Sequence, residues 1–324
     1  SFLAARGRRY RTDMSSPQTA AGACSRLSPH IVFGTVSIRE AYQGALRARA
    51  DLELDGDSTF AASLDMFLSR LQWHCHDMQK LENQTSRGGR NLLGEPDVRR
   101  DMVTDGDPRL EAWINGRTGF PFLDACMRSL NQTGWLNHRA RALVMAFASQ
   151  HLWMDWRHPA ARLAALFTDF EAAIHYPQAQ LQSGAAGPGI PRIYNPVKQS
   201  LDHDRDGAFI RRWVPELAAL PTAHIHAPWD APKAELAGTG IVLGQTYPMR
   251  IVDHMAAARE ARDRIYSAKA KAAPSHNAMS ETTGVRRSRS PAKRKAGTPN
   301  PAPRQLAFDL HMPDRASSGR SPTI

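Results

Sequence analysis

Residues 116–141 read GRTGFPFLDACMRSLNQTGWLNHRAR and contain the start, the apolar face and the end of one helix. Pro121 suits the first turn of a helix, because the amide hydrogen that proline lacks has no partner there. The apolar residues that follow recur at the three-to-four spacing of one helix face: Leu123, Cys126, Met127 and Leu130. Gly134 suits the position just after a last helical turn. The stretch therefore predicts a helix over residues 121–133.

The same helical pattern continues on both sides of this stretch. Ser37 and Glu40 have the spacing of a capping box, in which two side chains satisfy free amides at a helix start. A longer apolar face begins after Phe60 and comprises Leu64, Phe67, Leu68, Leu71, Cys75 and Met78. We therefore expect further helices over residues 37–50, 60–81, 137–153 and 159–167.

The intervening ranges 83–108 and 174–206 are dense in Gly, Pro, Asn and Asp, so we expect ordered loops there. No alternating run of β-branched residues indicates a strand. No repeat with a period of about 20–50 residues is visible either. The sequence thus predicts an all-α domain.

The formal charge of +11 is unevenly distributed along the 324 residues. Residues 267–324 are rich in Ala, Pro, Ser, Lys and Arg and cannot bury enough apolar surface to offset chain entropy, so we expect a disordered tail. This tail holds 11 Lys and Arg against 3 Asp and Glu, a net of +8, which leaves +3 for residues 1–266. We expect one domain over residues 1–266 and a basic tail that supplies a salt-sensitive contact with a polyanion.

Several classes of protein are excluded by missing motifs. The sequence has no phosphate-binding G-x-x-x-x-G-K-[ST] loop, no G-x-G-x-x-G between a strand and a helix, and no H-E-x-x-H pair. It has no run of about 18 apolar residues that would cross a membrane, and no apolar secretory segment follows Ser1. Its three cysteines lack paired spacing, which favours a reducing cytoplasm over a disulfide framework or a zinc ribbon.

Two histidine pairs have the residue type of a metal site but not its geometry. His74 and His76 stand two positions apart on an expected helix, so their imidazoles point about 200° apart and cannot share an ion. His224 and His226 lie in a proline-flanked loop without a third ligand nearby. We expect both pairs to be structural, and we expect no metal site.

Arg139 and Arg141 also lie two positions apart on a predicted helix, so they point to opposite faces. An inward arginine needs a partner, because an unpaired buried charge costs several kcal/mol. Asp169 and Glu171 are the natural candidates for that partner. The residues thus predict a helical domain with an acid–arginine pair around an anionic ligand, but composition does not identify that ligand.

Read as strings, six blocks of this sequence resemble the C-terminal flavin-binding domain of the photolyase/cryptochrome family. They fall in the family's order and together cover about residues 20–230. The blocks are Cys24–Pro29 with Phe33-Gly34, the helix around Trp73, Gly116–Leu130, Thr133–Arg141, Asp155–Arg157 and Arg192–Leu217. The resemblance implies an all-α domain that holds FAD without a Rossmann motif. The α/β antenna domain that precedes it in the family has no counterpart in these 324 residues.

The resemblance also implies roles for individual residues. The residues that match cofactor-binding positions are Tyr10, Ser25, Arg26, Leu27, Ser28, His74, His138, Arg141, Asp169 and Glu171. Among them, the segment from Ser25 to Ser28 matches the turn that binds the pyrophosphate, and Arg141 with Asp169 matches an ion pair beside the flavin ring. The catalytic positions are Trp73, Trp156 and His175. The residues expected to contact DNA are Arg70, Trp73, Arg211 and Arg212.

If the activity follows this resemblance, the protein is a flavin-dependent, light-driven DNA-repair enzyme of the deoxyribodipyrimidine photo-lyase type. Reduced FAD would pass an electron to a cyclobutane pyrimidine dimer flipped out of DNA, and Trp73 would stack on the lesion. The expected partner is DNA that contains pyrimidine dimers. We expect a monomer in the cytoplasm, associated with the bacterial nucleoid.

Departures from the family's pattern leave other functions open. His175 stands where repair enzymes have Asn near the flavin N5, and Arg70 stands where they have an acid. Of three tryptophans that reduce the flavin in light, only Trp156 is kept, with Ala179 and Val103 at the other two positions. The alternatives are a cryptochrome-like blue-light receptor that signals through the tail, and a flavoprotein that binds DNA without repairing it.

One short segment of the tail resembles a docking peptide. Gln305–Leu310 reads QLAFDL and is similar to the peptides that bind bacterial sliding clamps. The segment therefore has two interpretations, docking on a sliding clamp or a lone apolar patch in a disordered tail.

Overall fold

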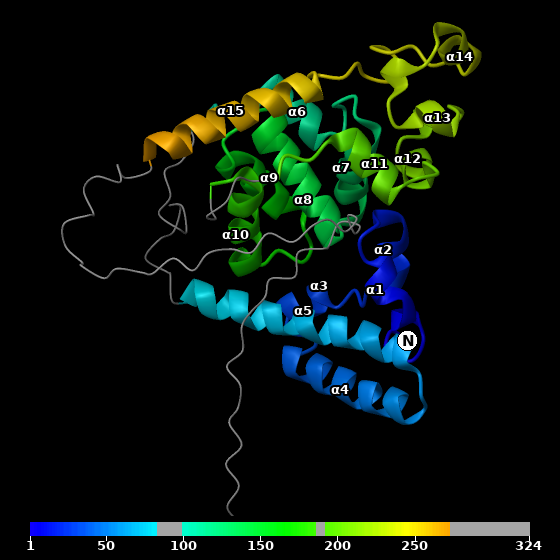
Figure 1. Ribbon diagram of the computed structural model, residues 1–324, viewed down its shortest axis with the longest axis vertical. Helices are drawn as coiled ribbons and strands as arrows, with labels where there is room; N and C mark the ends of the chain where they lie inside the picture. The colour runs from blue at the N-terminus through cyan, green and yellow to red at the C-terminus, as the bar shows by residue number, and fades with distance from the viewer. Residues whose placement is uncertain (83–98, 186–191, 273–324) are drawn as a thin grey trace, which may run out of the picture. The chain divides into compact units, whose positions relative to one another are not determined.

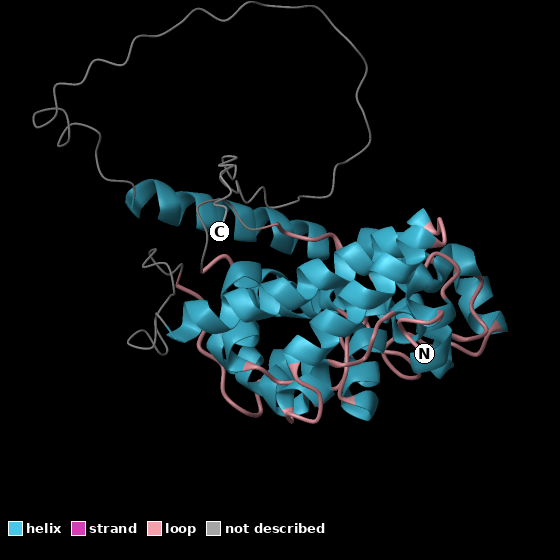
Figure 2. Cartoon of the chain, turned by 90° about the horizontal axis from the view of Figure 1, so that it is seen from below, coloured by secondary structure: helices cyan, strands magenta, loops and turns pink. Residues whose placement is uncertain are grey.

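The computed structural model describes residues 1–82, 99–185 and 192–272. Helices joined by turns make up these ranges, and the ranges contain no strand (Figure 1; Figure 2). Their β-type contacts are two isolated bridges, Asp101 with Met154 and Leu243 with Tyr247. The predicted all-α class is confirmed.

The helices follow one another in three runs along the chain. The N-terminal run comprises η1 (Arg6–Arg9), α1 (Tyr10–Asp13), α2 (Pro17–Ala23), α3 (Ser28–Val32), α4 (Ile38–Leu54) and α5 (Ser58–Glu82). The central run comprises α6 (Pro108–Ile114), α7 (Pro121–Thr133), α8 (His138–Ala146), the π-helical turn η3 (Phe147–His151), α9 (Arg157–Leu166) and α10 (Ala172–Ser183). The third run comprises α11 (Pro196–His203), α12 (Ala208–Trp213), η4 (Pro215–Leu217), α13 (Thr222–Ile225), η5 (Pro228–Asp230), α14 (Lys233–Gly238) and α15 (His254–Ala272).

Helices α4 and α5 lie side by side and bury the first of two apolar clusters (Figure 1). Its residues are Phe2, Tyr10, Ala41, Ala45, Phe60, Leu64, Phe67, Leu68 and Leu71. The predicted capping box starts α4, because the Ser37 hydroxyl accepts from the Glu40 amide at 3.1 Å and the Glu40 carboxylate accepts from the Ser37 amide at 2.9 Å. On α5 the buried face ends at Leu71, and the exposed Cys75 does not extend it as predicted.

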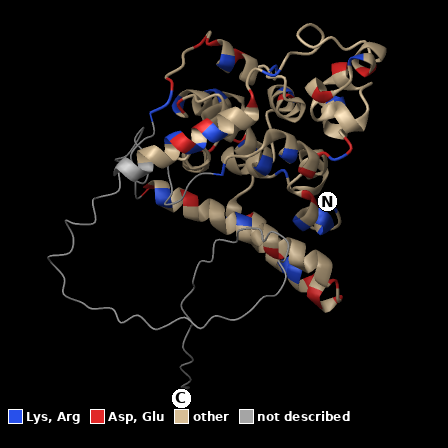
Figure 3. Cartoon of the chain, turned by 45° about the horizontal axis from the view of Figure 1, so that its top comes forward, with Lys and Arg blue, Asp and Glu red and all other residues tan. Residues whose placement is uncertain are grey.

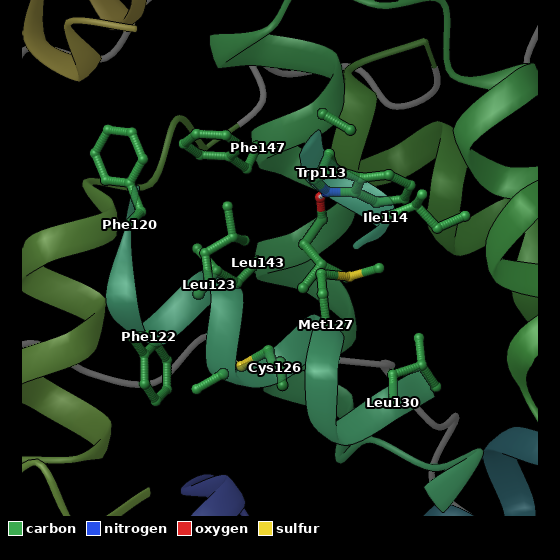
Figure 4. Close-up of a cluster of buried hydrophobic side chains, with 14 of the residues drawn as sticks. Trp113, Ile114, Phe120, Phe122, Leu123, Cys126, Met127, Leu130, Leu143 and Phe147 are labelled. Atoms are coloured by element: carbon green, nitrogen blue, oxygen red, sulfur yellow. Dashed lines mark hydrogen bonds between the residues drawn. The ribbon is translucent and has the colours of Figure 1, made fainter. Parts of the chain in front are cut away.

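The second cluster surrounds α7 and contains apolar residues of the stretch from Gly116 to Arg141 (Figure 4). The whole predicted apolar face is fully buried: Leu123, Cys126, Met127 and Leu130. Gly134 ends the helix with a φ of 67°, and a β-carbon there would meet the Thr168 side chain at 2.4 Å. The Trp113 indole donates to the Val144 carbonyl at 3.0 Å and joins α6 to α8. The predicted helix over residues 121–133 is confirmed.

A buried carboxylate ties α7 to the segment that precedes α15. Asp124 accepts from the Thr118 hydroxyl at 2.6 Å, the Thr118 and Gly119 amides at 2.8 and 3.0 Å, and the Tyr247 hydroxyl at 2.6 Å. Burial raises the pKa of this carboxyl to about 6. Gly119 has a φ of 80°, and a β-carbon there would lie 2.5 Å from the Arg250 backbone, so only glycine permits this approach.

The helix predicted over residues 137–153 is shorter and ends in a π-helical turn. Trp153, beyond that turn, adopts a φ of 55°. Its ring lies 4.9 Å from the Arg100 guanidinium and 4.8 Å from that of Arg264 on α15. Helix α15 packs against the turn η3.

The prediction of an ordered loop over residues 174–206 was wrong. Helix α10 continues through Ser183 although Pro177 lies inside it, and α11 begins at Pro196. The Asn195 side chain caps α11 by accepting from the Val197 and Lys198 amides, both at 3.0 Å. Prolines at helix starts and within a helix, together with the capping Asn, account for a composition that resembles a loop.

Helix α15 runs through Ala272, past the predicted domain end at residue 266. Both signs of charge lie along it (Figure 3). Arg264 forms an ion pair with Glu260 one turn before it. Residues 273–324, which include Gln305–Leu310, lie outside the described residues, as do residues 83–98 of the other predicted loop. No helix in the described ranges combines the length and apolar character that a membrane crossing needs.

Candidate functional site

The predicted acid–arginine pair lies between α8 and the loop that precedes α10. One Arg141 nitrogen donates to both carboxylate oxygens of Asp169, at 2.8 and 2.7 Å. Another donates to the Leu136 carbonyl at 2.8 Å, and the guanidinium lies 4.0 Å from the Phe167 ring. The Asp169 side chain is only 4% exposed. Asp169, and not Glu171, is therefore the partner that the sequence left open.

The turn over residues 24–28 lies beside this ion pair. Arg26 adopts a φ of 61° and stacks its guanidinium 4.0 Å from the Trp135 ring. Arg6 holds the turn by donating to the carbonyls of Cys24 and Ser25. A non-glycine residue in this left-handed conformation is held there by its surroundings, which here are the Arg6 contacts and the Trp135 stack.

Arg26 interacts electrostatically with Arg141 and Asp169 but forms no ion pair with a carboxylate in the described part of the chain. Burial lowers the pKa of its guanidinium, and the Asp169 carboxylate partly opposes that shift. Within residues 1–82, 99–185 and 192–272, Arg26 makes no hydrogen bond and no ion pair, and the Ser28 hydroxyl makes no hydrogen bond. Leu27 packs against the first apolar cluster, and its amide donates to the Ser25 hydroxyl at 3.4 Å. The turn thus offers a free guanidinium and a free hydroxyl to an anion.

Buried polar atoms near α5 and α8 also lack partners within the described part of the chain. Both ring nitrogens of His74 and the side-chain oxygen of Asn137 are buried without a hydrogen bond. The Asn137 amide group itself donates to the Met14 and Ser15 carbonyls at 3.0 and 2.8 Å. Such unsatisfied atoms are rare in folded proteins, so they fit a bound group with several hydrogen-bonding positions.

His138 and Tyr10 border a positively charged region. Surrounding protein atoms, and then the charges of Arg70, Arg139 and Arg141, lower the pKa of His138 to about 4. Its side chain is exposed to solvent. Burial raises the pKa of Tyr10 to about 12. Both side chains are therefore neutral at pH 7.

His175 lies close to the ion pair in an aromatic setting. Its Nε2 donates to the Ala160 carbonyl at 2.8 Å, and its ring contacts Phe167, Phe170 and Tyr176. Burial lowers the pKa of its imidazole. Because Nε2 carries the proton in this hydrogen bond, Nδ1 of the neutral ring remains as an acceptor.

The remaining predicted residues have mixed surroundings. Trp73 is 40% exposed, whereas Trp156 is buried and its indole nitrogen has no partner in the described ranges. Glu171 precedes α10 and makes no side-chain cap.

Arg211 donates to the carbonyls of residues 206, 218 and 220, so it holds a loop. Arg212 is exposed and stacks on Trp213, which makes it the better candidate for a phosphate contact.

The described residues contain no group of three or more His, Cys, Asp or Glu side chains that could hold a metal ion. His74 and His76 lie on one helix, and His224 pairs with Glu235 at 2.6 Å. His226 instead binds the Ser200 hydroxyl at 2.6 Å.

Sequence reasoning missed Arg6 and Asn137, which fix two sides of the site. Arg6 belongs to a basic run that is indistinguishable from solvated charge in the sequence. Asn137 precedes a helix, where it is expected as a cap, yet its amide group bonds to carbonyls near residue 14 instead. Its place within the specific block Thr133–Arg141 was the available signal.

Comparison with protein families gives one match over most of the central and third runs of helices. Residues 67–267 match the model of the FAD binding domain of DNA photolyase. The match begins after Tyr10 and the turn over residues 24–28, so it does not include those residues.

Curated and solved proteins of two named kinds are similar to this chain. Cryptochrome-2 of Arabidopsis thaliana is 34% identical over 242 residues, which are 74% of this chain and 39% of that protein. A deoxyribodipyrimidine photo-lyase of Agrobacterium fabrum is 34% identical over 250 residues, 76% of this chain and 49% of that protein. The crystal structure of a bacterial class III photolyase from Agrobacterium tumefaciens has a TM-score of 0.73 and 30% identity over 83% of this chain and 54% of that one. The chain spans about half the length of these relatives.

Proposed function

The chain belongs to the photolyase/cryptochrome family, and from this premise we propose that it is a light-driven DNA-repair enzyme that splits cyclobutane pyrimidine dimers. Its cofactor is FAD. Relatives named deoxyribodipyrimidine photo-lyase support the repair activity, and relatives named cryptochrome support the alternative of a light receptor.

The observation that carries the proposal is the buried Arg141–Asp169 pair with the unpaired Arg26 beside it. The Arg141 guanidinium has three contacts: it donates to the Leu136 carbonyl, lies against the Phe167 ring and donates twice to the Asp169 carboxylate. The free Arg26 guanidinium and Ser28 hydroxyl suit a pyrophosphate, because charge-assisted hydrogen bonds to phosphate are strong. The orphaned nitrogens of His74 and oxygen of Asn137 supply further hydrogen-bonding positions. These residues fit FAD.

When bound, reduced FAD supplies the light-excited electron that opens the dimer and recovers it afterwards. Arg141 and Asp169 would hold the flavin ring by presenting one ion pair of zero net charge to it. His175 presents Nδ1 as a hydrogen-bond acceptor, because the Ala160 carbonyl holds the Nε2 proton. Phe167 and Phe170, packed around that imidazole, keep water away from it.

Trp73 is the residue that we assign to the lesion. Its indole is 40% exposed on α5, and an exposed aromatic ring suits a base that has left the helix stack. The exposed Arg212 would bind the DNA backbone. A damaged pair costs less to open than an intact one, which favours the dimer as the base that reaches Trp73.

A light-receptor function remains the second candidate, because Arg70 and His175 replace the acid and the Asn expected in repair enzymes. The two functions are separated by one pair of measurements on FAD-loaded protein. Repair predicts light-dependent loss of dimers from an oligonucleotide by pre-reduced protein, with none in the dark. A receptor predicts no such loss, together with a change on illumination in the protease sensitivity of residues 267–324. A protein that binds DNA and does neither would be a flavoprotein without repair activity.

A further inference from the structure

Two histidines are buried where α15 meets the π-helical turn η3. His151 on η3 is 5% exposed, and His254, the first residue of α15, is 9% exposed. The His151 ring stacks on Phe147, with ring centres 4.9 Å apart. The His254 ring lies 5.6 Å from that of Phe120, which in turn lies 5.1 Å from that of Phe147. The two imidazoles therefore belong to one connected cluster of aromatic rings.

Three ring nitrogens of these histidines are buried without a hydrogen bond in the described part of the chain. They are both nitrogens of His151 and Nδ1 of His254. Buried polar atoms in folded proteins nearly always have a partner, so a pair of imidazoles that lacks three is unusual. A proton added to either ring would create a buried cation with no hydrogen-bond acceptor for it among these contacts.

The charged groups around the two rings oppose a second proton. Among the described groups, the one whose charge acts on His151 is His254, so protonation of one imidazole disfavours protonation of the other. His254 is faced by Asp253 and Asp230, which favour its charged form, and by Arg250, which disfavours it. Burial is the larger effect on both rings, and it lowers the pKa of His151 to about 4. Both imidazoles are therefore neutral at pH 7.

The position of His254 in its helix also disfavours a positive charge. The Asp253 carboxylate caps the start of α15 by accepting from the Met255 and Ala256 amides at 2.9 and 3.0 Å. His254 thus lies in the first turn, where the helix dipole is positive and a cation is destabilised.

Helix α15 is attached to the domain by few buried side chains. It lies at the edge of the helices in two views (Figure 1; Figure 2). Of the side chains described on it, over residues 254–268, those of His254, Ala261 and Ile265 are buried. A helix with so little buried surface is expected to open locally before the domain unfolds.

The segment just before α15 is fixed more firmly. The Tyr247 hydroxyl donates to the Asp124 carboxylate at 2.6 Å, and the Ile251 amide donates to the Thr118 carbonyl at 3.0 Å. These bonds end at Ile251, two residues before the Asp253 cap. A hinge for α15 therefore lies between them.

The surface that α15 covers has an irregular backbone. Residues Phe147–His151 form a π-helical turn, which is a rare conformation and is frequent at functional sites. Trp153 follows with a φ of 55°, and the Arg264 guanidinium of α15 lies 4.8 Å from its ring. Strained backbone of this kind concentrates in segments that change conformation.

We propose that His151 and His254 form an acid-sensitive latch, which docks α15 on η3 while both rings are neutral and releases it when they are protonated. In the released state His254 moves with α15 into water, and His151 loses its contact with that helix. The stability of the docked state is fully present above about pH 6.5, the ordinary pKa of histidine, and is lost as the pH falls toward 4. The latch is independent of the proposed repair activity.

Hydrogen exchange of the FAD-loaded full chain at pH 7.5 and pH 5, followed by mass spectrometry, tests the latch. Each rate is divided by that of an unstructured peptide at the same pH, which removes the chemical pH dependence of exchange. A change of the His151 pKa from 6.5 to about 4 should by itself lower the protection of α15 about thirtyfold between these pH values. At pH 5 the amides of α7 should remain more protected than those of α15.

The variants His151→Phe and His254→Phe remove the titrating groups and keep an aromatic ring at each position. Each should reduce the fall in protection, and the double variant should abolish it. Each variant is compared with itself at the two pH values, so a misfit that loosens α15 at both does not alter the result. His76→Phe is the matched control, because His76 is exposed on α5, and it should keep the wild-type fall.

Three results would overturn the latch. The first is a wild-type protein whose α15 amides are equally protected at pH 7.5 and pH 5. The second is a double variant that keeps the wild-type fall. The third is equal protection of α7 and α15 at pH 5, because the acid would then unfold the whole domain and not release one helix.

Discussion

Arg141 binds both oxygens of Asp169 with a single nitrogen, across 28 positions of sequence. The carboxylate is almost fully buried, whereas 27% of the arginine side chain is exposed. The pair thus brings α8 and the start of α10 to one point and leaves one edge of the guanidinium accessible. We propose that the flavin ring of FAD lies against this accessible part of the pair.

Asp169→Asn is expected to weaken both the fold and the hold on FAD. The substitution leaves a partly buried arginine without its counter-charge, which costs about 3 kcal/mol of unfolding free energy. We expect the ratio of flavin to protein after gel filtration to fall, and the denaturant midpoint to fall with it. The exposed ion pair of Lys198 with Asp202 offers the control. Asp202→Asn should change neither the flavin content nor the denaturant midpoint measurably. Full FAD retention by Asp169→Asn would contradict the assignment.

Removal of His151 is expected to stabilise the protein in acid. His151 is 5% exposed, stacks on Phe147 at 4.9 Å, and has no hydrogen bond at either nitrogen in the described ranges. Burial lowers its pKa from 6.5 to about 4. The folded state therefore resists protonation, and stability that is present above pH 6.5 is lost as the pH falls toward 4.

His151→Leu should reduce this acid loss by up to about 3 kcal/mol and leave stability at pH 7 unchanged or higher. Urea unfolding at a series of pH values between 4 and 7 measures it. The exposed His76→Gln should retain the wild-type slope. Identical slopes for His151→Leu and the wild type would show that the buried imidazole does not govern the acid limb.

The sequence predicted the parts of the fold that local chemistry decides. The capping box at Ser37 and the apolar face that follows Pro121 each fix a helix without help from elsewhere. Helices α10 and α11 were missed because Pro177 and Asn195 are loop residues by composition, and only their tertiary surroundings show a helix. The π-helical turn after α8 has no signal in the apolar periodicity.

In the candidate site, too, some contacts could be predicted from the sequence and others depend on the tertiary structure. The Arg141–Asp169 pair could be predicted because a buried arginine needs an acid and few acids lie nearby. The Arg6 contacts could not, since they depend on how η1 meets the turn over residues 24–28. Arg211 illustrates the opposite error, because a basic residue in an exposed-looking segment donates to three backbone carbonyls instead.

Light-driven reduction of the flavin and repair of DNA should respond differently to the loss of Trp156. The family reduces its flavin through three tryptophans, and of these positions only the buried Trp156 is a tryptophan here. Ala179 and Val103, at the other two positions, cannot carry an electron. We expect blue light alone to reduce the bound flavin poorly, followed through the absorbance of oxidised FAD. Trp156→Phe should leave repair by chemically pre-reduced protein unchanged. A parallel loss of repair in that variant would mean that Trp156 acts in the repair step itself.

The tail is expected to contribute charge and not cofactor binding. A chain ending at Ala272 keeps the whole of α15 and removes the basic block that includes Arg286, Arg287 and Arg289. Non-specific DNA binding should weaken, and the slope of log affinity against log salt should flatten by roughly 0.9 for each phosphate that the tail no longer neutralises. FAD content should not change. Replacing the three arginines by Gln in the full chain should flatten the slope in part, and an unchanged slope in both variants would contradict this role.

The most direct test of the account is the number of dimers split per bound FAD under blue light. Protein with reduced FAD is mixed with an excess of an oligonucleotide that carries one cyclobutane dimer, and restored strands are counted against time, in light and in the dark. The account predicts many restored strands per FAD in light, none in the dark, and a strong loss with Trp73→Ala while FAD stays bound. FAD-loaded, reduced protein that restores no strand in light would contradict it.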